Sequence, residues 1–279
     1  MNKRRVVVTG LGALTPIGNT AHEFWQNLIA GVSGAGPITQ FDTTHFKTTF
    51  ACEVKNFDPQ DFLDRKEARK MDRFTQFGVV VADEAIADSR IVEGGIDPDR
   101  IGVIWGSGIG GINTFFESTK DFIDRDMVPR FSPFFIPMMI SDITPGQISI
   151  KHGFRGPNFT TVSACASATN ALIDAFTYIQ LDKADAIVTG GSEATINPIA
   201  MGGFNSMHAL STRNDSPETA SRPFDKDRDG FVMGEGAACI ILEEYEHAIA
   251  RGAKIYAEVV GSGLSADAYH LTAPHPEGL

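Results

Sequence analysis

The stretch NFTTVSACASATNALIDAFTYIQ, residues 158–180, indicates a strand that runs directly into a helix. Residues 159–164 change from apolar to small side chains, which is typical of a buried strand near its end. After them, apolar and small residues recur at helical spacing on one face: Ala168, Ala171, Leu172, Ala175 and Ile179. We therefore expect a helix from Cys165 to about Leu181.

Similar alternation continues on both sides of this stretch. Three further runs are typical of buried strands: residues 4–10, 100–105 and 184–190. Thr20 and Glu23 form a capping box at the start of a helix that ends at Gly31, and a second helix is expected over residues 74–88. Strands that alternate with helices predict an α/β protein whose mainly parallel sheet is covered on both faces.

Cys165 lies where the expected helix begins. Unpaired N–H groups and the positive end of the helix dipole favour a thiolate there, and the small neighbouring residues leave room for a thioester carbonyl. Its own N–H could donate to an oxyanion. These features are compatible with a reactive thiol or with a buried, inert cysteine. Cys52 and Cys239 lie in apolar, strand-like settings that favour inert core thiols.

Composition and charge exclude several classes of protein. The 279 residues carry a net charge of −11, which argues against a general nucleic-acid binder. No apolar run is long enough for a signal peptide core or a membrane span. Three cysteines without zinc spacing favour a reducing compartment. We expect a cytoplasmic protein.

Three motifs imitate known sites but lack the context that those sites require. GSGIGG, residues 106–111, satisfies the dinucleotide-binding pattern, yet no second strand ending in an acid follows it. DKDRDGFVMGEG, residues 225–236, has the spacing of a calcium loop, but Gly236 stands where a bidentate glutamate is needed. The nucleophile elbow pattern around Ser192 has Ala194 in place of its second glycine. We expect no dinucleotide, calcium or other metal site.

A basic pattern precedes the helix expected at residue 74. Lys66, Arg69, Lys70 and Arg73 recur at i, i+3, i+4 and i+7, so they share one face if the stretch is helical. On an acidic protein such a face can attract an acidic partner. The alternative is an ordinary solvated helix surface.

Longer motifs carry a family resemblance over almost the whole chain. In order they include VVVTGLGALTPIGN, RKEARKMDRF, GSGIGG, SPFFIP, RGPNFTTVSACASATNA, SRPFDKDRDGFVMGEGA and SADAYHLTAP. With these motifs the chain resembles the elongating condensing enzymes of bacterial fatty-acid synthesis, the β-ketoacyl-acyl-carrier-protein synthases of the second type.

The resemblance implies a thiolase-like fold with duplicated halves in five layers, α-β-α-β-α. Residues 1–254 would form the first half, which carries the nucleophile, and residues 255–279 would begin the second. It also implies a homodimer and a reaction without a cofactor. Acyl carrier protein, loaded with acyl or malonyl groups, would be the partner.

Individual residues acquire roles through this resemblance. Cys165 matches the nucleophile that takes the acyl chain as a thioester. Ile109 matches the residue that limits the depth of the acyl pocket, and Phe204 another wall of it. Phe134 resembles a residue that reaches into the partner subunit's pocket. Thr272 matches a threonine beside the pantetheine arm, although Ala273 replaces the usual second hydroxyl residue.

The resemblance also favours a docking surface for the carrier protein, rather than an ordinary solvated helix surface, as the role of the basic residues. Lys66, Arg69, Lys70 and Arg73 would meet the acidic carrier protein, and Arg130 would extend their surface.

The family's remaining catalytic groups are two histidines and a lysine. They lie in an Asn-x-His-Gly-Thr motif and a later Gly-His segment, and a Gly-Phe-Gly-Gly loop completes the site. None of these motifs occurs in the 279 residues. The chain therefore corresponds to the N-terminal part of a condensing enzyme, and we expect no condensation by it alone. The rival interpretations are a thiolase-type acyltransferase that uses coenzyme A and a non-catalytic partner subunit.

Overall fold

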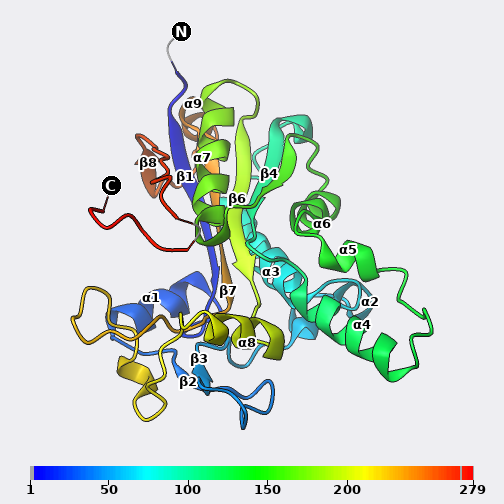
Figure 1. Ribbon diagram of the computed structural model, residues 1–279. Coiled ribbons are helices and arrows are strands. Elements are labelled where there is room, and N and C mark those ends of the chain that lie inside the picture. The colour runs from blue at the N-terminus through cyan, green and yellow to red at the C-terminus, as the bar shows by residue number, and fades with distance from the viewer. Residues whose placement is uncertain (1–2, 271, 279) are drawn as a thin grey trace.

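A six-stranded sheet forms the centre of the computed structural model, which describes residues 3–270 and 272–278 (Figure 1). Its strands follow the order β5-β4-β6-β7-β1-β8. Their bounds are β1 Val6–Leu14, β4 Ile101–Gly106, β5 Asn158–Thr161, β6 Ala186–Glu193, β7 Gly236–Glu244 and β8 Ala257–Val259. A separate ribbon pairs β2 (Gly36–Pro37) with β3 (Phe50–Ala51).

Helices cover both faces of this sheet, α3 on one side and α7 on the other (Figure 1). The α-helices are α1 Ala21–Ile29, α2 Arg65–Ala68, α3 Arg73–Ser89, α4 Ile112–Asp124, α5 Phe135–Met139, α6 Ile143–His152, α7 Ser167–Gln180, α8 Pro198–Ser206 and α9 Tyr245–Ala250. Short 3-10 helices are η1 Pro59–Asp61, η2 Pro98–Arg100, η3 Ala164–Ala166 and η4 Pro217–Thr219. The described residues thus form three layers, α-β-α.

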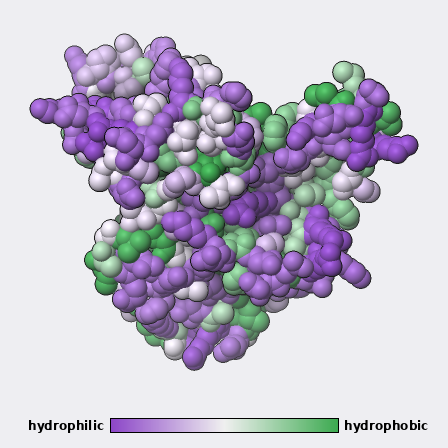
Figure 2. Space-filling view, turned by 90° about the horizontal axis from the view of Figure 1, so that it is seen from below, coloured by the Kyte–Doolittle hydropathy of each residue, from purple (hydrophilic) through white to green (hydrophobic). Residues whose placement is uncertain are grey.

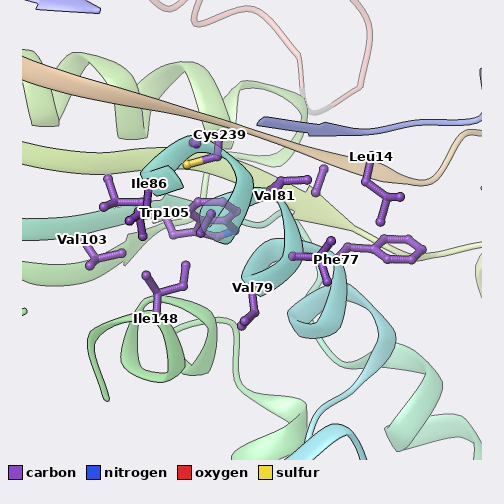
Figure 3. Close-up of a cluster of buried hydrophobic side chains, with 14 of the residues drawn as sticks. Leu14, Phe77, Val79, Val81, Ile86, Val103, Trp105, Ile148 and Cys239 are labelled. Atoms are coloured by element: carbon purple, nitrogen blue, oxygen red, sulfur yellow. The ribbon is translucent and has the colours of Figure 1, made fainter. Parts of the chain in front are cut away.

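Burial explains why the strands appear as continuous apolar runs. Between α3 and the sheet, Trp105, Phe77 and Cys239 converge with aliphatic side chains in the main core (Figure 3). Residues of opposite parity in the same strands, such as Ile104, face α7 and meet Phe176 there. Because both faces are covered, the inner strands β1, β4, β6 and β7 are largely buried and apolar on both sides, whereas the edge strands β5 and β8 are partly exposed.

The expectation of a mainly parallel sheet is wrong. Only β4 pairs in parallel, with β5 and with β6, whereas β7 runs antiparallel between β6 and β1, and β8 is antiparallel to β1. The physical reason is that a strand covered on both faces has the same apolar pattern in either direction. The long segment between α8 and β7 reverses the chain before β7 joins the sheet.

The expected capping box is confirmed in part. The Thr20 hydroxyl accepts the Glu23 N–H at 3.1 Å, as the pattern predicts. The Glu23 carboxylate, however, accepts the N–H of Asn19 at 2.8 Å rather than that of Thr20.

An ion-pair cluster ties three strands together at the edge where β4 and β6 begin. Asp185 accepts hydrogen bonds from Arg100 at 2.8 and 3.0 Å and from Arg4 at 2.7 Å. The Arg100 guanidinium, followed by that of Arg4, lowers the pKa of Asp185 to about 2. The cluster therefore holds the beginnings of β1, β4 and β6 together. The opposite edge of the sheet is the one at which β4 and β6 end.

The segment from α4 to α5 projects from the body on the right of Figure 1. In Figure 2 the projection on the same side carries hydrophobic atoms. Its exposed large apolar residues are Phe115, Ile123, Met127, Val128, Phe131, Phe134 and Ile136. Among the helices of the described residues, none has the length and apolarity needed to cross a membrane.

Candidate active site

Cys165 lies on a strained turn between β5 and α7. β5 ends at Thr161, the turn η3 covers Ala164–Ala166, and α7 begins only at Ser167. The helix therefore starts two residues later than expected, and Cys165 precedes its first turn. Ala164 has φ of +49°, a left-handed conformation that costs free energy for a residue with a side chain. Such strain is often found where a reactive group is presented to a site.

Small polar side chains hold this turn in place. Ser167 Oγ donates to the Ala164 carbonyl at 2.7 Å and accepts the Ser163 N–H at 2.9 Å. Asn170 Nδ2 donates to Ser163 Oγ at 2.6 Å, and Thr161 Oγ1 donates to the Ser167 carbonyl at 2.7 Å. The Ser, Thr and Asn residues around the cysteine thus satisfy the backbone groups of an irregular turn.

Glycines at the ends of β4 and β6 let the start of α7 approach the sheet. A Cβ on Gly106 would lie within 2.5 Å of Ala168 Cα and of the Ser167 carbonyl carbon. A Cβ on Gly191 would lie 2.6 Å from Ala168 Cβ. Any side chain at these positions would push the helix, and the turn before it, away from the sheet.

Cys165 is exposed and lines a pocket of about 460 Å³. The other residues that line this pocket are mostly apolar or glycine: Gly106, Ser107, Gly108, Ile109, Ala164, Ser167, Ala168, Gly191, Ser192, Glu193, Thr195, Phe204, Phe231, Met233, Gly234 and Gly236. The structure thus brings Cys165, Ile109 and Phe204 together around one pocket. Within the described ranges no hydrogen bond occupies the Cys165 N–H, which leaves it free to donate to an oxyanion beside the thiol.

The glycine loop of residues 106–111 binds a carboxylate of the protein itself. Glu193 accepts the N–H groups of Gly108, Ile109 and Gly110 at 2.7, 3.0 and 3.3 Å. Three successive amides of this kind form an anion-binding nest. Burial raises the pKa of Glu193, and its three N–H partners oppose that rise. The loop that imitates a dinucleotide site therefore already holds an anion, and sequence reasoning did not identify Glu193.

The other two cysteines and Ser192 have structural settings. Burial raises the pKa of both the Cys239 and the Cys52 thiols, which keeps them protonated. Ser192 is buried and accepts the Trp105 Nε1–H at 2.9 Å, so it braces the core. Cys165 is the one exposed thiol among the described residues.

Phe134 and Thr272 lie outside this pocket in the described part of the chain. Phe134 precedes α5 on the projecting segment, 40% exposed, with Lys70 Nζ 5.7 Å from its ring centre. Thr272 is exposed near the end of the chain, where its N–H donates to His270 Nδ1 at 3.1 Å.

The basic residues do not share one helix face, so that expectation is wrong. α2 ends at Ala68, and α3 begins at Arg73 after Asp72, whose carboxylate accepts the Phe74 N–H and caps the new helix. Arg73 faces inward and forms two hydrogen bonds with the buried Glu235, at 2.9 and 3.1 Å.

The other basic side chains remain at the surface. Lys66, Arg69 and Arg130 are exposed. Arg69 lines a groove that also contains Ser132 and Phe135 of the projecting segment. Lys70 pairs with Glu67 at 2.7 Å. Three or four cations, rather than five, are therefore available to a docking partner.

The carboxylates of the calcium-like segment, residues 225–236, accept hydrogen bonds from the protein itself. Asp229 accepts hydrogen bonds from Ser211 Oγ at 2.7 Å and from the Thr212 N–H at 3.0 Å, and Asp225 accepts the Asp227 N–H at 2.7 Å. Across residues 3–270 and 272–278, no group of His, Cys, Asp and Glu side chains is arranged to hold a metal ion.

Comparisons with known proteins agree with this geometry. The family model described as β-ketoacyl synthase, N-terminal domain, matches residues 3–248. The chain is 52% identical to 3-oxoacyl-[acyl-carrier-protein] synthase 2 of Synechocystis sp. over 278 residues, which cover 100% of this chain and 67% of that protein. It is also 52% identical to the protein of the same name from Staphylococcus aureus, covering 99% of this chain and 66% of that one. The chain thus spans about two thirds of the length of these relatives.

Solved structures give the same result. A β-ketoacyl synthase from Burkholderia phymatum superimposes with a TM-score of 0.89 at 33% identity, covering 98% of this chain and 67% of that one. A ketosynthase in complex with its type II PKS acyl-carrier protein superimposes with a TM-score of 0.74 at 25% identity, covering 92% of this chain and 67% of that one.

Proposed function

Because the chain belongs to the β-ketoacyl synthase family, we propose that Cys165 accepts the growing acyl chain in the elongation of fatty acids. One observation carries the proposal. Cys165 is exposed and lines a largely apolar pocket, and its N–H has no acceptor among the described residues, whereas Cys239 is buried and Cys52 is partly buried.

The first half-reaction is an acyl transfer between two sulfurs. Cys165 Sγ attacks the carbonyl carbon of an acyl thioester, and the resulting oxyanion accepts a hydrogen bond from the Cys165 N–H. The bond from carbon to Cys165 Sγ forms, and the bond from carbon to the carrier's sulfur breaks. The released carrier thiolate takes up the proton that Cys165 loses, so the step needs no other reactant.

The second half-reaction joins two carbons. Malonyl-acyl carrier protein loses carbon dioxide, and the resulting carbanion attacks the carbonyl carbon of the Cys165 thioester. The carbon–carbon bond forms as the bond from carbon to Cys165 Sγ breaks, which leaves a 3-oxoacyl chain on the carrier and a Cys165 thiolate that takes up a proton from water. In the family this step uses two histidines and a lysine whose motifs are not among these 279 residues. We therefore assign the acyl transfer to this chain and the condensation to the longer protein that its relatives represent.

Pocket and surface residues receive roles on the same basis. Ile109 and Phe204 line the Cys165 pocket, which supports their roles as walls around the acyl chain. Thr272 would meet the pantetheine arm, and Phe134 would reach a second copy in a homodimer. Both are exposed, as those roles require.

Acyl carrier protein is the proposed donor, and the cytoplasm the proposed location. The chain has a net charge of −11, but it exposes positive side chains at Lys66, Arg69 and Arg130. These side chains would attract an acidic carrier protein locally. One structural relative was itself solved with an acyl-carrier protein.

A thiolase-type acyltransferase is the main rival, because it would use coenzyme A. The discriminating experiment measures acyl transfer to the purified chain from matched acyl-carrier-protein and acyl-coenzyme A donors, with Cys165→Ala as the control. We expect faster transfer from the carrier protein and none to the variant. Equal or faster transfer from coenzyme A would favour the thiolase, and transfer to Cys165→Ala would exclude Cys165 as the acceptor.

A further inference from the structure

The loop that carries Ile109 is held along its whole length by hydrogen bonds from its backbone. On one side Glu193 accepts three successive N–H groups, those of residues 108–110. On either flank, the Ser107 N–H donates to the Thr161 carbonyl at 3.4 Å and the Gly111 N–H donates to the Met139 carbonyl at 3.0 Å. The path of the loop therefore depends on Glu193 at its centre.

Residues 138–141 lie close against the loop at Gly110 and Gly111. Gly110 has φ of +78°, and a Cβ there would lie 2.7 Å from Ser141 Oγ. A Cβ on Gly111 would overlap the Met138 carbonyl. The loop is thus confined between Glu193 and residues 138–141, and its one large side chain is Ile109.

Ile109 occupies the position where this confinement matters for a ligand. It lines the Cys165 pocket and is 45% exposed, so surrounding side chains cover it only in part. Its backbone is held by the N–H that Glu193 accepts at 3.0 Å. Among the described lining residues, Glu193 is also the one with a formal charge.

We propose that Glu193 is a positioning residue that fixes Ile109, and so sets which lengths of acyl chain the Cys165 pocket admits. The proposal rests on the proposed function for its substrate class, an acyl chain. A carboxylate suits this role because its two oxygens together accept all three N–H groups, whereas an amide would turn an NH₂ group toward at least one of them.

Glu53 provides a matched control. Its carboxylate also accepts three hydrogen bonds from a loop, those of the Thr39 N–H, the Thr39 hydroxyl and the Gln40 N–H, at 2.7–3.2 Å. It is buried and does not line the Cys165 pocket. Glu53→Gln should therefore lower the stability of the chain as Glu193→Gln does, but it leaves the hydrogen bonds of the loop that carries Ile109 in place.

The experiment compares alkylation of Cys165 by N-hexyl and N-tetradecyl iodoacetamide, followed by mass spectrometry. We expect the wild-type chain to distinguish the two lengths by more than tenfold. Glu193→Gln should move that ratio toward one by about tenfold, equivalent to about 1.4 kcal/mol. Glu53→Gln should leave the ratio unchanged. In an Ile109→Ala background, Glu193→Gln should have no further effect, because the two residues act through one wall.

Two results would overturn the proposal. One is an unchanged ratio in Glu193→Gln. The other is an equal change with and without Ile109, which would mean that Glu193 contacts the chain directly. Because iodoacetamides alkylate a thiol without enzyme chemistry, this test is separate from the proposed function. A wild-type chain with the expected alkylation ratios that takes no acyl group from any thioester would support the positioning role and refute the proposed function.

Discussion

Gly106→Ala is the substitution that most directly couples the fold to the Cys165 turn. Gly106 ends β4 directly under the start of α7. The added Cβ would lie within 2.5 Å of Ala168 Cα and of the Ser167 carbonyl carbon, and would also overlap the Ala168 nitrogen. All three atoms belong to the helix backbone, so no side-chain rotation can relieve the overlap.

The expected cost follows from this geometry. Overpacking of a core generally costs about 1–3 kcal/mol, and we expect the upper end, about 3 kcal/mol, because backbone must move. For a domain of this size each kcal/mol lowers Tm by about 2–4 °C, so the expected decrease is about 6–12 °C. The displaced helix would also shift Cys165, and alkylation of this thiol should change by at least about threefold.

The assay pairs thermal unfolding with the alkylation rate of Cys165, and Gly203→Ala is the control. Gly203 lies in α8, is exposed and has no atom within 4 Å of an added Cβ. Alanine there should be neutral or stabilise the chain by up to about 1 kcal/mol, because it favours a helix over glycine. If Gly106→Ala unfolds within 2 °C of the Gly203→Ala control, the close approach of α7 to β4 is not as described.

Three further predictions address stability, acidity and docking. Ser192→Ala should cost about 1–3 kcal/mol, measured by urea unfolding, because it leaves the buried Trp105 N–H without its acceptor; a cost below 0.5 kcal/mol would contradict this. The stability that Asp185 adds over Asp185→Asn should be full above about pH 5 and be lost progressively as the pH falls through 2 to about 1, because its folded pKa is about 2 and an acid with a lowered pKa stabilises only while ionised. An advantage that is undiminished at pH 2 would refute that pKa. Charge reversal of both Lys66 and Arg69 to Glu should slow acyl transfer from carrier protein about tenfold at low salt and leave transfer from coenzyme A within twofold, whereas equal slowing of both would exclude a docking role.

The sequence predicted the strands and helices on both faces of the sheet because burial determines their patterns. It could not predict the direction of β7, since the run GAACIILEE is apolar in either orientation. The break between α2 and α3 did have a local signal. Asp72 stands before an apolar helical pattern as an N-cap, whereas regular spacing of charges suggested a single helix.

Some residues of the site were predicted from the sequence, and Glu193 was not, because only local patterns can be recognised in the sequence. Cys165 and Ile109 stand out because each lies in a motif that is contiguous in the chain. The role of Glu193 depends on contacts with Gly108, Ile109 and Gly110, which precede it in the chain by 83 to 85 positions. No local spacing encodes contacts at such a separation. Its one signal was indirect. Glu193 ends β6, and GSGIGG follows β4, so two neighbouring parallel strands bring them to the same edge of the sheet.

The most direct test of Cys165 as the acceptor is to locate the acyl group on the chain. The wild-type chain would be incubated with an acyl-carrier-protein thioester, digested and mapped by mass spectrometry at Cys52, Cys165 and Cys239. We predict one acyl group per chain, on Cys165 alone, released by hydroxylamine as a thioester would be. Acylation of Cys52 or Cys239, or a chain that remains unmodified while its Cys165 still reacts with iodoacetamide, would contradict it.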